Sequence, residues 1–148
     1  MKTFLFSLSA LFMVIACGNK QAQTQSTEQA LVAEAPGDSG KVYRLLRASE
    51  FNAQMQKESG VLLDVRTPGE YKKGFIAGAT LMDIFSDDFD AKLAALDKSK
   101  TYYVYCAKGG RSEECSEKMM ALGFKRVFDL DGGITGWKDS GLPIEMPK

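Results

Sequence analysis

The chain has 148 residues, 45% of them hydrophobic and 26% charged, which fits one ordinary globular domain with room for a tail. Its 19 basic and 19 acidic residues cancel, and this zero net charge argues against nucleic acid as a general partner, because nucleic-acid binding normally needs a basic face. The chain contains no histidine, which excludes Ser-His-Asp and Cys-His catalysis and the common zinc sites.

Residues 1–16 have the pattern of a secretory signal peptide. Lys2 gives a short positive start, and the apolar stretch 4–16 that follows is too short for a membrane-spanning helix. The stretch runs into Val14-Ile15-Ala16-Cys17, which resembles the lipobox of bacterial lipoproteins. The resemblance implies cleavage before Cys17 and lipidation of that cysteine. An ordinary secretory signal with an incidental cysteine is the alternative.

A lipidated Cys17 would anchor the mature protein to a membrane without spanning it. Each buried methylene of the acyl chains contributes about 0.8 kcal/mol, so several chains together hold a protein permanently. The expected location is the periplasmic side of a membrane in a bacterial cell envelope. Gly18 stands where inner-membrane lipoproteins often carry Asp, which favours the outer membrane.

Residues 17–40 are predicted to form a flexible tether between the lipid and the folded domain. They are rich in Gln, Ser, Thr and Ala, lack aromatic residues and show no sustained apolar period. Such a segment cannot bury enough apolar surface to offset the entropy lost on ordering it. The folded domain is therefore expected over residues 41–148.

Five short runs in this domain have the composition of β-strands, and helical stretches lie between them. Strands that alternate with helices indicate a parallel sheet covered on both faces, so the fold class is α/β. The runs are VYRLL (42–46), VLLDV (61–65), ATLMD (79–83), TYYVY (101–105) and RVFDL (126–130).

The helical stretches carry recognisable start signals. Ser49 is expected to cap a first helix that carries Phe51 and Met55. The run Thr67-Pro68-Gly69-Glu70 combines a capping box with proline at the first helical position. Ser86 precedes a third helix, over which apolar residues recur at helical spacing. A fourth helix is predicted to carry an apolar stripe of Cys115, Met119 and Leu122.

Cys106 follows the strand 101–105 directly and precedes the fourth helix, in the stretch YVYCAKGGRSEE (103–114). In a parallel sheet this position lies at the carboxyl edge of the strands, where ligands bind. A free cysteine has a pKa of about 8.5, and the attacking species is its thiolate. The glycines at 109 and 110, the following helix start, Lys108 and Arg111 all favour the anion, and Ser112 adds a hydroxyl donor.

A loop that stabilises a thiolate also suits an oxyanion such as sulfonate or phosphate. Cysteine phosphatases place five residues between the cysteine and the arginine of such a loop. Here four residues separate Cys106 from Arg111, and Ser112 occupies the position where a phosphatase would need arginine. A cysteine phosphatase or arsenate reductase therefore remains an alternative that the loop length disfavours.

Four sequence blocks between residues 42 and 147 follow one another in an order and at a spacing that point to a known family. Cys106–Ser112 fits the pattern C-x-x-G-x-R-S. The other blocks are LDVRTPGEY (63–71), GFIAGA (74–79), and a closing stretch with Asp131-Gly132-Gly133, Trp137 and Gly141-Leu142-Pro143-Ile144. Together they resemble the single-domain rhodanese sulfurtransferases. Phe75 and Ala77 depart from the histidine and proline that are usual in that family.

The resemblance implies a single small rhodanese-like α/β domain with a five-stranded parallel sheet and helices on both faces. It also implies a ping-pong reaction that needs no metal or organic cofactor. Cys106 would take the outer sulfur of thiosulfate or a persulfide and pass it to a thiol or cyanide. The residues implied to bind the anionic donor are Ala107, Lys108, Gly109, Gly110, Arg111 and Ser112.

Some assignments stay open at this point. A persulfide carrier, which passes its sulfur only to a protein partner, would use the same loop. Asp64 and Arg66 match family positions near the site, and structural ion pairing, with Glu70 as a partner of Arg66, is favoured over direct chemistry. Cys115 is expected to be a core residue instead of a resolving thiol for Cys106. Trp137 is expected to pack in the core.

Overall fold

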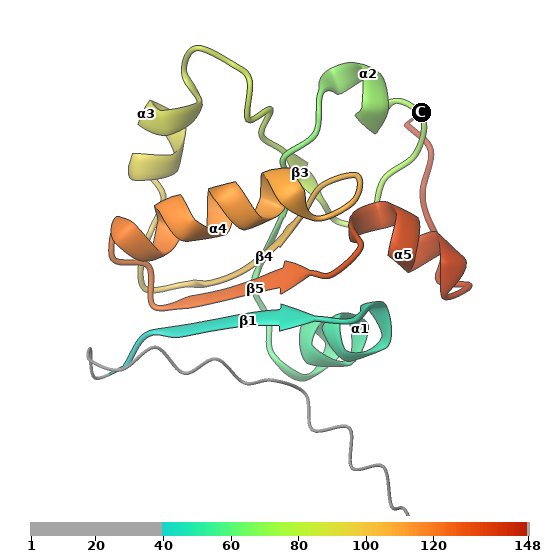
Figure 1. The fold of residues 1–148 in the computed structure, drawn as a ribbon, viewed down its shortest axis with the longest axis horizontal. Coiled ribbons are helices and arrows are strands. Elements are labelled where there is room, and N and C mark those ends of the chain that lie inside the picture. The colour runs from blue at the N-terminus through green and yellow to red at the C-terminus, as the bar shows by residue number, and fades with distance from the viewer. Residues whose placement is uncertain (1–39, 148) are drawn as a thin grey trace, which may run out of the picture. The chain divides into compact units, whose positions relative to one another are not determined.

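The computed structural model describes residues 40–147 of the chain. The predicted signal peptide, Cys17 and nearly all of the predicted tether lie outside the described residues. Within residues 40–147, strands and helices alternate (Figure 1). In chain order they are β1 (Val42–Leu46), α1 (Ala48–Lys57), β2 (Val61–Asp64), α2 (Pro68–Tyr71), β3 (Thr80–Leu81), α3 (Phe89–Ala94), β4 (Thr101–Tyr105), α4 (Gly110–Ala121), β5 (Arg126–Leu130) and α5 (Gly133–Asp139).

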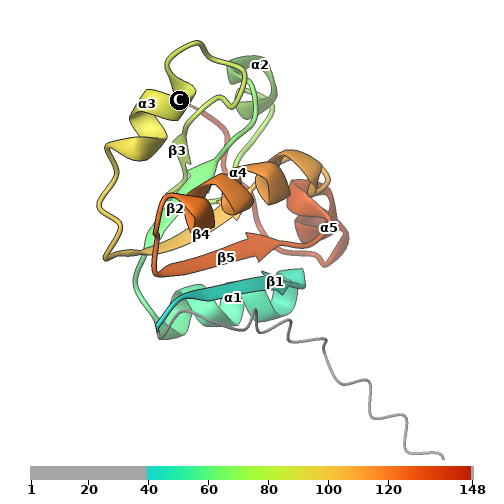
Figure 2. The same ribbon diagram turned by 60° about the vertical axis from the view of Figure 1, so that its left-hand side comes forward.

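The strands form one five-stranded sheet in the order β1-β5-β4-β2-β3, and all neighbouring strands are parallel. The predicted α/β class and the parallel sheet are thus confirmed. β1, β4 and β5 have the predicted bounds, whereas β2 ends one residue early and β3 contains only two residues. Figure 2 shows β2 and β3 on the side of the sheet that lies away from β1.

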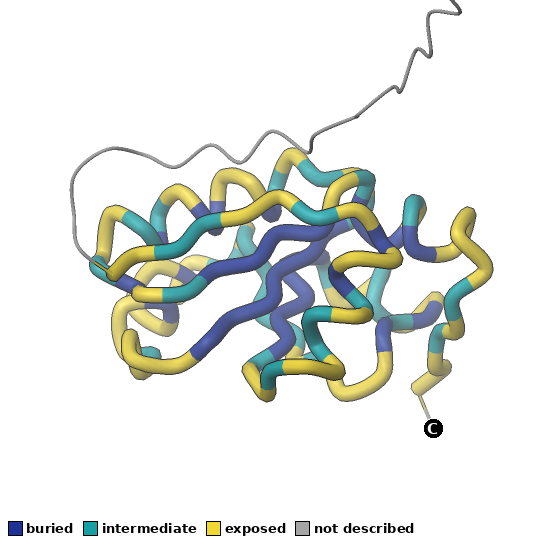
Figure 3. Tube along the Cα trace, turned by 90° about the horizontal axis from the view of Figure 1, so that it is seen from below, coloured by how far each residue is buried: buried dark blue, intermediate teal, exposed yellow. Residues whose placement is uncertain are grey.

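Helices cover both faces of the sheet, as predicted. One core cluster joins α3 and α4 to the sheet through Phe89, Leu93, Cys115 and Met119. The other cluster includes residues of α1 and α5, among them Phe51 and Trp137. Figure 1 shows α4 and α1 on opposite sides of β5 and β1. The central strands are buried along their length (Figure 3), which explains their nearly continuous apolar sequences.

The predicted helix starts are confirmed in part. Thr67 caps α2, because its backbone N–H donates to Oε2 of Glu70 at 3.1 Å while its Oγ1 accepts the N–H of Glu70 at 3.4 Å. The predicted cap at Ser49 is wrong. α1 begins at Ala48, and the backbone N–H of Arg47 donates to Oε2 of Glu50 at 3.1 Å. None of the helices within residues 40–147 is long and apolar enough to cross a membrane.

The predicted stripe on α4 is also confirmed in part. Cys115 and Met119 are fully buried, but Leu122, which follows the end of α4 at Ala121, is 37% exposed. Trp137 lies in the core, where its Nε1 donates to the carbonyl oxygen of Pro143 at 2.8 Å. Phe75, which replaces the family histidine, stacks on Tyr71 with ring centroids 4.3 Å apart.

Candidate active site

Cys106 follows β4 and lies at the carboxyl edge of the sheet, with its side chain in the core cluster beneath α4. The residue is only 2% exposed. The backbone N–H of Gly109 donates to the sulfur at 3.1 Å. Gly109 adopts φ 112°, a left-handed conformation that glycine takes without strain, and this turn leads into α4 at Gly110. The loop therefore bends its backbone around the sulfur.

The N-terminal part of α5 holds the outer side of this loop. The backbone N–H of Ile134 donates to the carbonyl oxygen of Cys106 at 2.9 Å. The carbonyl oxygen of Ala107 accepts two hydrogen bonds from Thr135, one from its N–H at 3.2 Å and one from its Oγ1 at 2.9 Å. α5 thus binds two carbonyl groups of the loop, while the N–H of Gly109 is directed to the sulfur.

Gly133 is the point at which α5 touches the loop most closely. A Cβ atom at this position would lie 2.5 Å from the carbonyl oxygen of Cys106 and 2.7 Å from the backbone nitrogen of Lys108. The residue also has φ 56°, in the left-handed region. Only glycine therefore fits here without displacing the loop. The Gly132-Gly133 pair of the closing sequence block therefore lies directly against the loop that follows Cys106.

The pKa of Cys106 is lowered from its ordinary value. Burial alone would raise the pKa, because it disfavours the thiolate. Hydrogen bonds outweigh this effect: they come from the backbone N–H and hydroxyl of Ser112, and from the backbone N–H groups of Gly109 and Lys108. The site thus stabilises a thiolate through directed donors in a buried setting.

Arg111 is held by Glu70 in a two-pronged ion pair. Its Nη1 donates to Oε2 of Glu70 at 2.8 Å, and its Nη2 donates to Oε1 at 2.7 Å. The hydrogen bonds with Arg111 are the main reason why the pKa of Glu70 falls to about 2. The pKa of Arg111 is raised, first by Glu70 and also by the nearby sulfur of Cys106. Glu70, at the capped start of α2, therefore holds the Arg111 guanidinium near the sulfur of Cys106.

The Arg111 guanidinium also lies over an aromatic ring. Phe85, in the segment between β3 and α3, lies with its ring centroid 5.7 Å from the guanidinium carbon. Its side chain is largely exposed, at 69%. Lys108 is also exposed. An apolar ring and a solvated cation thus stand at the outer rim of the loop.

Asp64 and Arg66 form a buried ion pair of their own. Arg66 donates from Nε to Oδ1 of Asp64 at 2.8 Å, and from Nη2 to the carbonyl oxygen of Gly74 at 2.9 Å. The predicted pairing of Arg66 with Glu70 is wrong, because Arg66 turns back onto Asp64 while Glu70 binds Arg111. This ion pair joins the end of β2 to the segment that follows α2, and its role is therefore structural.

Cys115 is a free, fully buried thiol inside α4. Burial, followed by the charge of Asp129, raises its pKa to about 12. Cys106 is also a free thiol. The prediction that Cys115 is a core residue is confirmed, and Cys115 forms no disulfide with Cys106.

The structure brings the predicted loop residues together around one sulfur atom. Asp64 and Arg66 lie outside this loop, in the buried pair described above. The roles predicted for the loop residues in binding a donor stay predictions. Sequence reasoning missed the support from α5 and the hold of Glu70 on Arg111. The residues involved are Glu70, Phe85, Gly133, Ile134 and Thr135.

This arrangement can generate a sulfur nucleophile and bind an anion in the same place. The thiolate needs donors because it is buried, and the loop amides supply them. The same amides, with Arg111 beside them, would stabilise negative charge on a substrate or on a sulfur attached to Cys106.

Comparison with known proteins agrees with this geometry. Residues 47–140 match the rhodanese-like domain family. A sulfurtransferase of Allochromatium vinosum is 33% identical over 91 residues, which cover 62% of this chain and 83% of that protein. A tRNA uridine(34) hydroxylase of Yersinia enterocolitica is 31% identical over 119 residues, but these cover only 33% of that longer protein.

A solved structure shows the same fold. The crystal structure of a rhodanese-related protein from Thermoplasma volcanium superposes with a TM-score of 0.63 at 31% identity, over 71% of this chain and all of that one. The family match spans more than half of the chain and includes the Cys106 loop and the start of α5 that supports it. The chain belongs to the rhodanese-like family, as a homologue of rhodanese-type sulfurtransferases.

Proposed function

We propose that the protein transfers a sulfane sulfur from thiosulfate or a persulfide donor to a thiol or cyanide acceptor, through a persulfide on Cys106. The observation that carries this proposal is the buried sulfur of Cys106, whose pKa is lowered by donors of its own loop. A buried thiol with no such donors would be protonated and inert near neutral pH. This loop instead favours the form that attacks sulfur.

In the first half-reaction, the Cys106 thiolate attacks the outer sulfur of thiosulfate. A new S–S bond forms at Sγ, the S–S bond of thiosulfate breaks, and sulfite leaves with the bonding electron pair. In the second half-reaction, an acceptor thiolate attacks the outer sulfur of the persulfide. That step breaks the S–S bond at Cys106 and returns its thiolate. No net oxidation of the protein occurs over the cycle.

The loop supports both half-reactions with the same groups. The backbone N–H of Gly109 and the donors of Ser112 stabilise the thiolate before attack and again as it departs. Arg111, aligned by Glu70, offers a fixed positive charge to the anionic donor. Lys108 adds a second charge at the exposed rim, where it would attract the donor from solution.

The first experiment is mass spectrometry of the protein after incubation with thiosulfate, with the modified cysteine located by peptide mapping. We expect a reducible gain of one sulfur atom on Cys106, which Cys106→Ser abolishes and Cys115→Ser retains. Steady turnover with cyanide or small thiols would then separate an enzyme from a persulfide carrier. No gain on a Cys106 shown to be free and reactive would contradict the proposal, and aryl phosphates would be tested next.

We also propose that the protein is lipidated on Cys17 and held at the periplasmic side of a bacterial membrane. The support is the sequence Val14-Ile15-Ala16-Cys17 after a short apolar stretch. Expression in a bacterial host followed by membrane fractionation tests this. We expect the protein in the membrane fraction with acyl chains detected on Cys17 by mass spectrometry, and Cys17→Ala without acyl chains. A wild-type protein that carries no acyl chains on Cys17 would contradict lipid anchoring at this residue.

A further inference from the structure

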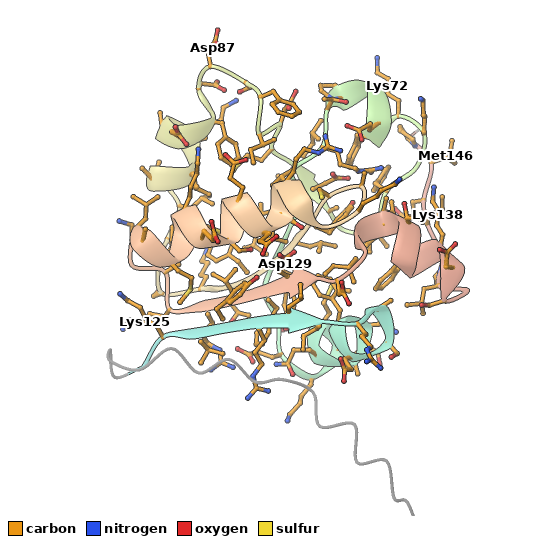
Figure 4. The ribbon with its side chains drawn as sticks, in the orientation of Figure 1. Lys72, Asp87, Lys125, Asp129, Lys138 and Met146 are labelled. Atoms are coloured by element: carbon orange, nitrogen blue, oxygen red, sulfur yellow. The ribbon has the colours of Figure 1, made fainter. Side chains whose placement is uncertain are left out.

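A pocket of about 300 Å³ lies at the amino end of the sheet, where β1 and β5 begin and α1 ends. Cys106 follows the last residue of β4, so it lies at the opposite, carboxyl end of the parallel strands. Figure 4 labels Lys125, just before the start of β5, and Lys138 of α5 beyond the other end of that strand. The pocket is therefore separate from the candidate active site. Its lining includes three cations, one carboxylate and two apolar side chains, which are Arg44, Lys57, Arg126, Glu58, Val42 and Phe128.

The strand register brings two of the three cations to one face of the sheet. Val42 pairs with Arg126 and Arg44 pairs with Phe128, and side chains two residues apart in a strand point to the same face. Phe128 packs in the core cluster that contains residues of α1, which identifies this face as the one that α1 covers. α1 ends at Lys57, which adds the third cation. Three separate elements thus bring positive charge to one pocket.

Glu58 provides the carboxylate of this lining, and its oxygens already have three donors. Its Oε2 accepts hydrogen bonds from Nη2 of Arg126 at 2.7 Å and from Nε2 of Gln54 at 3.0 Å. Its Oε1 accepts the hydroxyl of Thr101 at 2.6 Å. These bonds, with that from Arg126 first, lower the pKa of Glu58 and keep it ionised at neutral pH. The single negative charge of Glu58 therefore balances Arg126 and leaves the other two cations unbalanced.

Arg44 and Lys57 are exposed, and neither forms an ion pair with any residue of the range 40–147. Glu58 also leaves Arg126 incompletely satisfied, because its Nε is buried without a hydrogen-bond partner in that range. Three cations against one carboxylate leave an excess of two positive charges around the pocket. In the whole chain, by contrast, 19 basic and 19 acidic residues cancel. Like charges around one pocket repel, and a bound anion with two charges would remove this repulsion.

We propose that this pocket binds a small organic dianion, a dicarboxylate or a phosphate ester, between Arg44, Lys57 and Arg126. The volume is at the lower end of the range of small-molecule sites, about 300–1,000 Å³. The planar guanidinium groups of the two arginines match the geometry of carboxylate and phosphate, and the ammonium of Lys57 adds a point charge. Val42 and Phe128 offer apolar surface to the hydrocarbon part of the ligand. This site is additional to sulfur transfer and does not depend on it.

The test is a titration of the isotope-labelled protein with succinate and, separately, with glycerol 3-phosphate, followed by two-dimensional NMR at constant ionic strength. We expect saturable shifts of the amide signals of Arg44, Lys57 and Arg126 with at least one of these dianions. The response to each probe shows whether the site prefers carboxylates or phosphate. Acetate at the same ionic strength carries one charge and should shift these signals only weakly.

The double variant Arg44→Gln/Lys57→Gln removes the two unbalanced charges. Both side chains are exposed, so the variant should fold, and we expect it to bind the dianion at least about tenfold more weakly. The matched control is Lys100→Gln/Lys138→Gln, which removes the same charge from two exposed lysines outside the lining. This control should bind like the wild type. Thermal unfolding gives a second readout, because the dianion should raise the Tm of the wild type and of the control more than that of the Arg44→Gln/Lys57→Gln variant.

Three results would overturn the proposal. Shifts that grow without saturation, or equally with acetate, would show general screening of charge. Equal binding by both double variants would show that Arg44 and Lys57 do not hold the dianion. Shifts confined to residues 106–112 would show that dianions bind only at the loop of Cys106. Since the titration involves no sulfur donor, its failure and a failure of sulfur transfer are read separately.

Discussion

Cys106 and Cys115 are both buried thiols of the same core cluster, yet their environments shift their pKa values in opposite directions. Cys115 lies within α4, where burial, followed by the charge of Asp129, raises its pKa to about 12. Cys106 lies just before α4, where the loop turns backbone N–H groups toward its sulfur and lowers its pKa. Burial alone therefore does not decide the reactivity of a cysteine. The orientation of the backbone around the sulfur decides it.

Replacing each cysteine in turn gives the largest contrast. Cys106→Ser removes the nucleophile and should lower sulfur transfer by about a thousandfold or more, as for other enzymes that lose their attacking group. Cys115→Ser should leave the rate within about threefold of the wild type, because no step uses that thiol. Steady-state turnover with thiosulfate and cyanide measures both. Comparable losses in the two variants would contradict the assignment of Cys106 as the nucleophile and of Cys115 as a core residue.

The loop's orientation depends on α5, and Gly133→Ala should disturb it. The added Cβ would lie 2.5 Å from the carbonyl oxygen of Cys106 and cannot fit without moving the loop. We expect sulfur transfer to fall by at least about tenfold and the free energy of unfolding to fall by about 1–3 kcal/mol. Turnover and urea unfolding measure the two effects.

Gly141→Ala is the matched control for this change. Gly141 has a comparable positive φ of 73°, but a Cβ there meets no atom within 4 Å. It should cost only backbone strain, about 1 kcal/mol, and leave turnover intact. If Gly141→Ala lowered turnover as much as Gly133→Ala, strain at a glycine would explain the loss and the close contact with the loop would not.

Glu70→Gln tests the ion pair that aligns the cation beside Cys106. The pKa of Glu70 is about 2 in the folded protein against an ordinary 4.5, so its pairing stabilises the fold above the ordinary value and is lost as the pH falls toward 2. Since the side chain is 31% exposed, we discount the pKa difference to about 1–2 kcal/mol at pH 7. The free energy of unfolding, measured in urea at pH 7 and pH 3, should converge between variant and wild type at the lower pH.

Glu114→Gln provides the control for that experiment. Glu114 pairs with Lys118 at 3.6 Å, and its side chain is 58% exposed. An exposed pair of this kind contributes little to stability, so the variant should unfold like the wild type at both pH values. A difference between Glu70→Gln and wild type that stayed constant from pH 7 to pH 3 would show that lost packing, and not the charge of Glu70, is responsible.

Local sequence patterns predicted much of this fold, because the features that define these elements lie within a few neighbouring residues. The apolar runs at residues 42–46, 101–105 and 126–130 match three strands in full, since strands buried on both faces need continuous apolar sequence. The capping box at Thr67 was readable because its two partners lie three residues apart. The glycine–cation loop after Cys106 was likewise contained in a few adjacent residues.

The parts that sequence did not predict depend on long-range contacts. α5 contains glycine at 133 and 136, which disfavours a helix, and it is held by bonds to loop carbonyls far away in the sequence. Glu70 was assigned to the nearby Arg66, but it binds Arg111, 41 residues away.

The smallest expected effect comes from Phe85, whose ring lies close to the Arg111 guanidinium. The ring lies 5.7 Å from the guanidinium carbon, and such a contact at an exposed site is worth about 0.5–1 kcal/mol. Phe85→Leu should therefore raise KM for thiosulfate by about twofold to fivefold with kcat unchanged, because it loosens a binding group and leaves the nucleophile as it is. Phe85→Tyr keeps the aromatic face and should behave like the wild type in steady-state assays. An equal rise in KM for both variants would show that the hydrocarbon shape at this rim matters and the aromatic ring does not.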